Sequence, residues 1–126
     1  MSELIIRTGI DLEKVSRVMD LKESIRSRFV KRIFTPAEMV GKPLTPMHIT
    51  GLFCAKEAVA KALGCGIGPI SWQDIEIGTE SGGSPSVLLT GDAHRLATEI
   101  GIIDWSVSIT HTREYAAAVA VGYGQK

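Results

Sequence analysis

The segment that most constrains the fold is an apolar helix whose end is marked by glycine. Apolar residues recur at helical spacing between Ile49 and Leu63, and glycines at 64, 66 and 68 with Pro69 follow them. Spacings of three and four residues place apolar side chains on one helical face, and glycine after the last turn is a common C-cap. The sequence therefore predicts a helix over roughly residues 48–63 that packs against the rest of the protein.

The neighbouring segments carry strand and helix patterns in turn. Residues 3–11 alternate apolar and polar side chains, which predicts a half-buried strand that ends at Asp11. Asp20 with Glu23 is a capping-box pattern before one helix, and Thr35 to Glu38 repeats the pattern before a short one. Further along, we expect strands at 72–78, 85–90, 105–111 and 115–121, and a helix at 91–100. This order predicts an α+β fold with an antiparallel sheet packed with helices.

Length and composition indicate one ordinary globular domain over residues 1–126. The chain is 44% hydrophobic, and its 14 basic and 14 acidic residues give zero net charge, so no nucleic-acid or membrane partner is indicated. Cys54 and Cys65 have neither redox nor zinc-ligand spacing. The chain shows neither a membrane-length apolar run nor a signal peptide, and we expect a cytoplasmic protein.

Positive charge is concentrated near the N-terminus. Residues 14–32 contain only Asp20 and Glu23 as acids, against the bases Lys14, Arg17, Lys22, Arg26, Arg28, Lys31 and Arg32. Two interpretations are open, a solvated helix face and a docking surface for an acidic partner.

Two carboxylates and a lysine are the first candidates for chemistry. Asp11 and Glu57, without a cluster of imidazoles or thiolates, suit a hard cation such as Mg²⁺ that also contacts substrate phosphates, and Lys61 would then bind phosphate. The structural alternatives are an N-cap or surface ion pair for Asp11, and an i,i+4 helix pair between Glu57 and Lys61, which contributes only ~0.2–0.5 kcal/mol.

An imidazole and a glycine-rich loop are the remaining candidates. His111 is open to roles as a third ligand, a general base, a hydrogen-bonding partner of substrate or a structural residue. The loop from Gly64 to Pro69 lacks the endings of the P-loop and dinucleotide motifs, so it acts as a helix C-cap or allows close backbone approach to a ligand.

Taken together, these segments resemble a known family. The resemblance rests on Gly9-Ile10-Asp11 with Val15 and Arg17, Arg32-Ile33-Phe34-Thr35 with Glu38, Lys56-Glu57-Ala58 with Lys61 and Gly64, and Ser108-Ile109-Thr110-His111 with Tyr115-Ala116. In order and spacing they are similar to the 4′-phosphopantetheinyl transferases, in particular the short holo-[acyl-carrier-protein] synthase group. Two departures are Leu52, where many relatives have arginine, and Thr110, where serine is usual.

The resemblance implies an activity and a set of site residues. The activity is transfer of the phosphopantetheine arm of coenzyme A to a serine of acyl carrier protein, with release of adenosine 3′,5′-bisphosphate. Mg²⁺ would bind Asp11 and Glu57, which with Lys61 form the catalytic set. Coenzyme A would contact Lys61, Gly64, Pro85 and His111. The acidic carrier would dock on Arg17, Lys22, Arg26 and Arg28.

The family's short members are expected to be homotrimers with active sites between subunits. The acceptor of the serine proton is left open between Glu57, a metal-bound water and Glu38. Two rival interpretations are a Mg²⁺-dependent hydrolase of nucleotide pyrophosphates and a non-catalytic module that binds an acidic partner.

Overall fold

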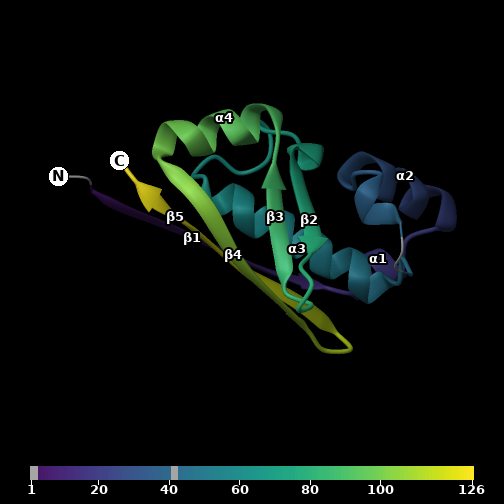
Figure 1. Ribbon diagram of the computed structural model, residues 1–126. Helices are drawn as coiled ribbons and strands as arrows, with labels where there is room; N and C mark the ends of the chain where they lie inside the picture. The colour runs from purple at the N-terminus through teal and green to yellow at the C-terminus, as the bar shows by residue number, and fades with distance from the viewer. Residues whose placement is uncertain (1–2, 41–42) are drawn as a thin grey trace.

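A three-stranded antiparallel sheet with one long helix across its inner face organises the molecule (Figure 1). The computed structural model describes residues 3–40 and 43–126. The strands are β1 (Leu4–Lys14), β4 (Ile102–His111) and β5 (Tyr115–Gln125), in the order β1-β5-β4. Helix α3 (Pro46–Ala62) packs on β1 and β5. The α+β fold expected from the sequence is confirmed.

Smaller elements surround this unit. A two-stranded sheet of β2 (Ile75–Thr79) and β3 (Pro85–Leu89) contacts α3 and β4, and α4 (Gly91–Ile100) follows it. Helices α1 (Ser16–Met19) and α2 (Glu23–Ile33) lie together at the opposite end of the molecule from α4 (Figure 1). No helix in the described ranges is long and apolar enough to span a membrane.

Several predicted boundaries were wrong. Strand β1 continues to Lys14 and β5 to Gln125, because the two strands pair with each other over their whole length. The segment Trp72–Asp74 is a 3-10 turn held by a Ser71–Asp74 capping box, so the strand after it begins at Ile75.

The two predicted helix caps had different outcomes. Asp20 is not an N-cap, because its backbone N–H donates to Ser16 O at 2.8 Å and ends α1, and α2 has no side-chain cap. The second capping box is confirmed. Thr35 Oγ1 accepts from the Glu38 N–H at 3.3 Å, and Glu38 Oε1 accepts from the Thr35 N–H at 2.8 Å. The helix that it begins is a single 3-10 turn, Ala37–Met39 (η1).

The long helix starts and ends at clear signals. It begins two residues earlier than predicted because Pro46 occupies its first position and Thr45 Oγ1 accepts from the His48 N–H at 3.2 Å. At its other end Gly64 has a φ of 82°, in the left-handed region that favours glycine, and its N–H donates to Lys61 O. The role of this glycine as a C-cap is confirmed.

A buried ion pair fixes the side of α3 that faces η1 and β2. Lys56 is fully buried, and its Nζ donates to Glu38 Oε1 at 2.7 Å and to the backbone oxygens of Ile75 at 2.6 Å and Trp72 at 3.1 Å. Glu38 Oε2 accepts from the Ile77 N–H at 2.7 Å. All three Lys56 donors are used, which is what allows a charged group to be buried here.

Glycine at position 9 allows β1 to cross α3 in direct backbone contact. A Cβ at Gly9 would lie 2.8 Å from the Ala62 nitrogen and would overlap the Ala58 carbonyl oxygen. Both obstacles are backbone atoms of a packed helix, so no side-chain rotation relieves the overlap. The crossing places Gly9 to Asp11 of β1 beside the last two turns of α3.

We therefore expect Gly9→Ala to destabilise the protein by about 3 kcal/mol or more, because the strand must move away from the helix. Gly82→Ala is the matched control, since a Cβ there meets nothing within 4 Å and its φ lies outside the left-handed region. Denaturant unfolding of both variants tests this expectation. Equal stabilities of the two variants would show that the crossing is not tight.

Candidate active site

The crossing of β1 and α3 brings together the three residues first selected for chemistry. Lys61 Nζ donates to Asp11 Oδ1 at 3.1 Å and to the carbonyl oxygen of Ile10 at 2.9 Å. Glu57 lies one helical turn before Lys61, on the face of α3 that meets β1. The i,i+4 pair between Glu57 and Lys61 is not formed, since the lysine reaches across to the strand.

Asp11 has one oxygen in use and one free for a ligand. Its Oδ1 accepts from Lys61, whereas Oδ2 is buried and has no hydrogen-bond partner within the described part of the chain. A buried carboxylate oxygen without a partner is costly, and a cation is the usual compensation. Asp11 is therefore neither a helix cap nor a fully satisfied surface ion pair.

Like charges are concentrated around this free oxygen. Burial raises the pKa of the Glu57 carboxyl above its ordinary value, and the negative charges of Asp11 and Glu13 raise it further against the opposing effect of Lys61. The field extends into the core, where burial raises the pKa of the Cys54 thiol to about 12, with Asp11 and Glu13 adding to the effect. The site carries more negative charge than its own lysine neutralises.

Glu13 is a site residue that the sequence analysis missed. Burial raises its pKa, followed by the charge of Asp11, and Arg17 Nη1 lies 3.5 Å from its Oε1. The signal was present in the sequence, because residues i and i+2 of a strand share a face. It was missed because the strand was predicted to end at Asp11.

These residues fit a hard divalent cation. No group of three metal-ligating side chains is found in the described ranges, so the two carboxylates of Asp11 and Glu57 would supply only part of a coordination sphere. Mg²⁺ is commonly bound in this way, through one or two carboxylates, several waters and substrate phosphates. The free Asp11 Oδ2 and the raised pKa of Glu57 are the observations that support this fit.

A second feature is a cleft of about 520 Å³ between α3, the β2–β3 hairpin and the end of β4. Pro85 and His111, both predicted to contact coenzyme A, line it together with Leu52 and His48. None of Asp11, Glu57 or Lys61 lines this cleft. The structure thus divides the predicted site residues between two surfaces of one chain. Gly64 lies at the end of α3 near Lys61.

Glu38 borders the cleft but does not suit the role of proton acceptor. Its side chain is only 1% exposed, and its two oxygens accept from Lys56 Nζ, the Thr35 N–H and the Ile77 N–H. A carboxylate held by three donors is poorly available to a substrate hydroxyl. Its observed role is to anchor η1 against α3 and β2.

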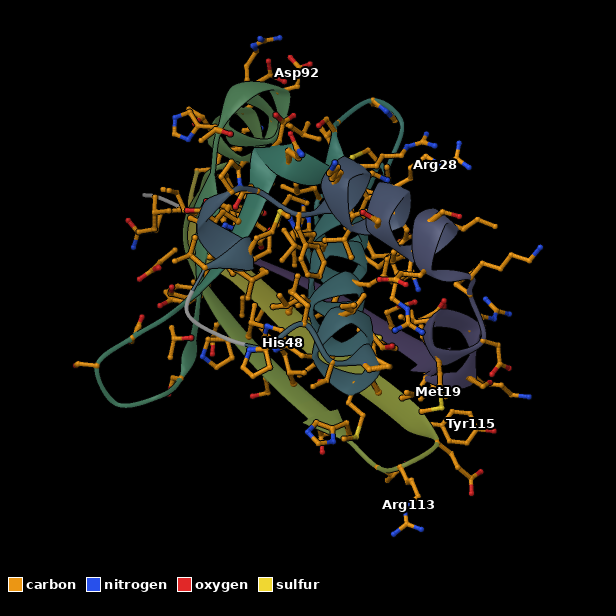
Figure 2. All side chains as sticks on the ribbon, turned by 90° about the vertical axis from the view of Figure 1, so that its right-hand side faces the viewer. Met19, Arg28, His48, Asp92, Arg113 and Tyr115 are labelled. Carbon is orange, nitrogen blue, oxygen red and sulfur yellow. The ribbon has the colours of Figure 1, made fainter. Side chains whose placement is uncertain are left out.

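The basic residues predicted to dock a carrier fall into two groups. Arg17, Lys22 and Arg28 are exposed, and Figure 2 shows Arg28 extending outward from α2. Arg26 is half-buried, and its Nη2 donates to the Met19 carbonyl at the end of α1 at 2.8 Å. Arg26 therefore connects α1 to α2.

Comparisons with known proteins show the family to which the chain belongs. A family model described as the 4′-phosphopantetheinyl transferase superfamily matches residues 7–120. The holo-[acyl-carrier-protein] synthase of Moorella thermoacetica is 45% identical over 121 residues, which cover 92% of each sequence.

Solved structures of holo-[acyl-carrier-protein] synthases have a similar fold. The crystal structure of Helicobacter pylori holo-[acyl-carrier-protein] synthase in complex with coenzyme A is similar with a TM-score of 0.81 at 31% identity, covering 91% of this chain and 98% of that one. Plasmodium yoelii holo-ACP-synthase gives a TM-score of 0.84 at 28% identity, covering 98% and 99%. The chain therefore belongs to the 4′-phosphopantetheinyl transferase superfamily and is an enzyme of that class. This removes the non-catalytic binding module as an interpretation.

The crowded carboxylates predict a pH-dependent response to metal. Because the folded-state pKa of Glu57 is raised, its ionisation costs stability as pH rises through that pKa, and the cost is absent below the unfolded value. We expect Mg²⁺ to raise the Tm more at about pH 7.5 than at about pH 5. Without metal, Glu57→Gln should have a higher Tm than the wild type near neutrality.

Differential scanning fluorimetry with and without Mg²⁺ measures this effect. The control is Glu99→Gln on the exposed side of α4, which should keep the wild-type response. Asp11→Asn and Glu57→Gln should both lose it. A full Mg²⁺ response in either variant would contradict the two-carboxylate site.

Proposed function

We propose that this enzyme transfers the 4′-phosphopantetheine arm of coenzyme A to a serine of apo acyl carrier protein in a Mg²⁺-dependent reaction. The observation that carries the proposal is the convergence of Asp11, Glu57 and Lys61, with a buried Asp11 oxygen free for a cation. The serine oxygen forms a bond to the phosphorus next to the pantetheine arm. The bond from that phosphorus to the bridging oxygen of the diphosphate breaks, and adenosine 3′,5′-bisphosphate leaves with that oxygen.

Phosphoryl transfer depends mainly on positioning and charge neutralisation, which these side chains provide. Mg²⁺, held by Asp11 and Glu57, would neutralise charge on the diphosphate when bound. Lys61, fixed against Ile10 O and Asp11, places a positive charge at the same edge of the site. Of the proton acceptors left open, Glu38 is already held by three donors, so Glu57 and a water at the metal remain.

Mass spectrometry of apo carrier protein incubated with coenzyme A, Mg²⁺ and enzyme tests the reaction. We expect the carrier to gain one phosphopantetheine arm, with one adenosine 3′,5′-bisphosphate per carrier, and a chelator to stop the reaction. Asp11→Asn and Glu57→Gln should lower kcat by about 100-fold or more, whereas Glu99→Gln should not. Release of nucleotide from an unmodified carrier would favour the rival hydrolase.

The basic surface supports docking of an acidic carrier. Helices α1 and α2 lie at one end of the molecule, close to the start of α3, and their exposed bases carry the local positive excess noted in the sequence (Figure 1). Met19 is 52% exposed and Ile25 is 42% exposed on the same helices, so the surface offers apolar contacts as well. Charge of this kind chiefly accelerates and orients association.

Charge reversal separates docking from folding. We expect Arg28→Glu to raise the carrier KM several-fold at low ionic strength, to leave kcat nearly unchanged, and to lose its effect at high salt. Arg26 is a poor test residue because it also bonds to Met19 O. Arg95→Glu on α4 is the matched control. Kinetics of Arg28→Glu that match this control would refute the docking surface.

The outer face of the large sheet supports the proposed homotrimer. Leu4, Ile6, Ile10 and Leu12 of β1 are 54–68% exposed, and Val119 of the neighbouring β5 is 39% exposed. Register places Ile10 beside Val119 on this face. A contiguous apolar surface of this kind typically marks an interface. An assembly of copies would cover it and would allow the cleft of one subunit to meet the Asp11–Glu57 site of another.

Analytical ultracentrifugation and mixing test this assembly. We expect Val119→Lys to dissociate the trimer and lower activity, while Leu88→Lys, at an exposed apolar residue of β3, stays assembled. Mixing inactive Asp11→Asn with inactive His111→Ala should recover about a quarter of the wild-type activity, the share of interfaces with both residues intact. A fully active monomer would overturn the proposal.

The proposal includes a cytoplasmic setting. Both cysteines are free thiols, and Cys54 is buried where it cannot take part in disulfide exchange. A reducing compartment suits such residues.

A further inference from the structure

The last turn of α2 is held to the body of the molecule by the side chain of Gln73. Its Nε2 donates to Lys31 O at 2.9 Å and to Phe34 O at 2.9 Å. Both oxygens belong to the end of the helix, where the last carbonyls lack intrahelical donors. The Thr35 N–H, which would continue the helix by donating to Lys31 O, donates to Glu38 Oε1 instead. Gln73 therefore caps α2 from a segment that is distant in the sequence.

The 3-10 turn that carries this glutamine, Trp72–Asp74 (η2), is fixed to α3. Lys56 of α3 donates to the carbonyl oxygens of Trp72 at 3.1 Å and of Ile75 at 2.6 Å, the first within the turn and the second directly after it. Lys56 is also the residue before Glu57 of the candidate active site. The helix that carries the active site thus sets the position of η2.

Aromatic rings join the same three elements. Phe53 of α3 pairs with Phe29 of α2, with ring centroids 5.7 Å apart, and with Trp72 of η2, with centroids 5.0 Å apart. Tilted ring pairs at such separations are favourable beyond the apolar area that they bury. Among the described elements, η2 is the one that α2 contacts most. The position of α2 relative to α3 therefore depends on these rings and on the amide of Gln73.

We propose that Gln73 is a positioning residue for the carrier protein, because it holds the basic end of α2 where a docked carrier can present its serine to the candidate active site. The inference rests on the proposed function. The turn that Gln73 caps carries the exposed bases Lys31 and Arg32, and Arg28 lies one turn earlier. Gln73 does not line the cleft beside α3, so it acts through α2. A loosened helix end would spread these charges over many positions and weaken their guidance of an acidic partner.

Replacement of Gln73 by Met removes both hydrogen bonds and keeps the length of the side chain. At low ionic strength we expect Gln73→Met to raise the carrier KM about five-fold, with kcat and the coenzyme A KM within about two-fold of the wild type. Hydrogen–deuterium exchange should become faster in the last turn of α2 and stay unchanged in α3. The control is Thr98→Ala, which removes an exposed bond from Thr98 Oγ1 to His94 O on α4 and should keep the wild-type carrier KM.

A double-variant cycle with Arg28→Glu separates positioning from a general loss of stability. Because Gln73 acts by placing the bases of α2, Gln73→Met should raise the carrier KM by a smaller factor in the Arg28→Glu background than in the wild type. Equal factors in the two backgrounds, a wild-type carrier KM in Gln73→Met, or unchanged exchange at the end of α2 would each overturn the inference and leave the transferase proposal intact. A wild-type carrier KM in Arg28→Glu would overturn the docking surface and this role of Gln73 with it.

Discussion

The contact between Gly9 and the backbone of α3 is the constraint on which the rest of the site depends. Any side chain at position 9 would overlap the Ala58 carbonyl oxygen, so β1 crosses the helix at a distance that only glycine permits. Two residues later the strand presents Asp11 to Lys61 at 3.1 Å. Because both elements are regular and mutually packed, the distance between the strand carboxylate and the helix residues is set by backbone geometry instead of flexible loops.

Two consecutive residues of α3, Lys56 and Glu57, have different structural roles. Successive positions on a helix are rotated by about 100°, so Lys56 and Glu57 face different neighbours. Lys56 is fully buried against Glu38 and two carbonyl oxygens on the side of η1 and β2. Glu57 lies on the side of β1, where the negative charge of Asp11 adds to the effect of burial in raising its pKa. The Lys-Glu-Ala motif thus combines an anchor that fixes the helix with a carboxylate that the anchored helix holds in place.

The sequence predicted elements better than it predicted partners. Glycine marked the C-terminal end of α3, and the Thr35–Glu38 box was predicted correctly because its bonds are local. The Asp20–Glu23 pattern failed because a preceding turn, α1, used Asp20 for its own end. Nothing local predicted that Lys61 would bond to a strand fifty residues away instead of to Glu57, or that Glu38 would be buried under Lys56. Both outcomes depend on tertiary packing.

The predicted site residues lie on two surfaces of the chain, and these surfaces differ in charge. One surface of the chain holds excess negative charge around Asp11, Glu13 and Glu57, and a separate cleft holds imidazoles without lysine or arginine among its described residues. Under the proposed function, a cation at the carboxylates would neutralise the diphosphate of coenzyme A, while the cleft would hold another part of the same ligand. A single chain keeps these surfaces apart, and the apolar outer face of its sheet offers the contact through which a second copy would bring them together.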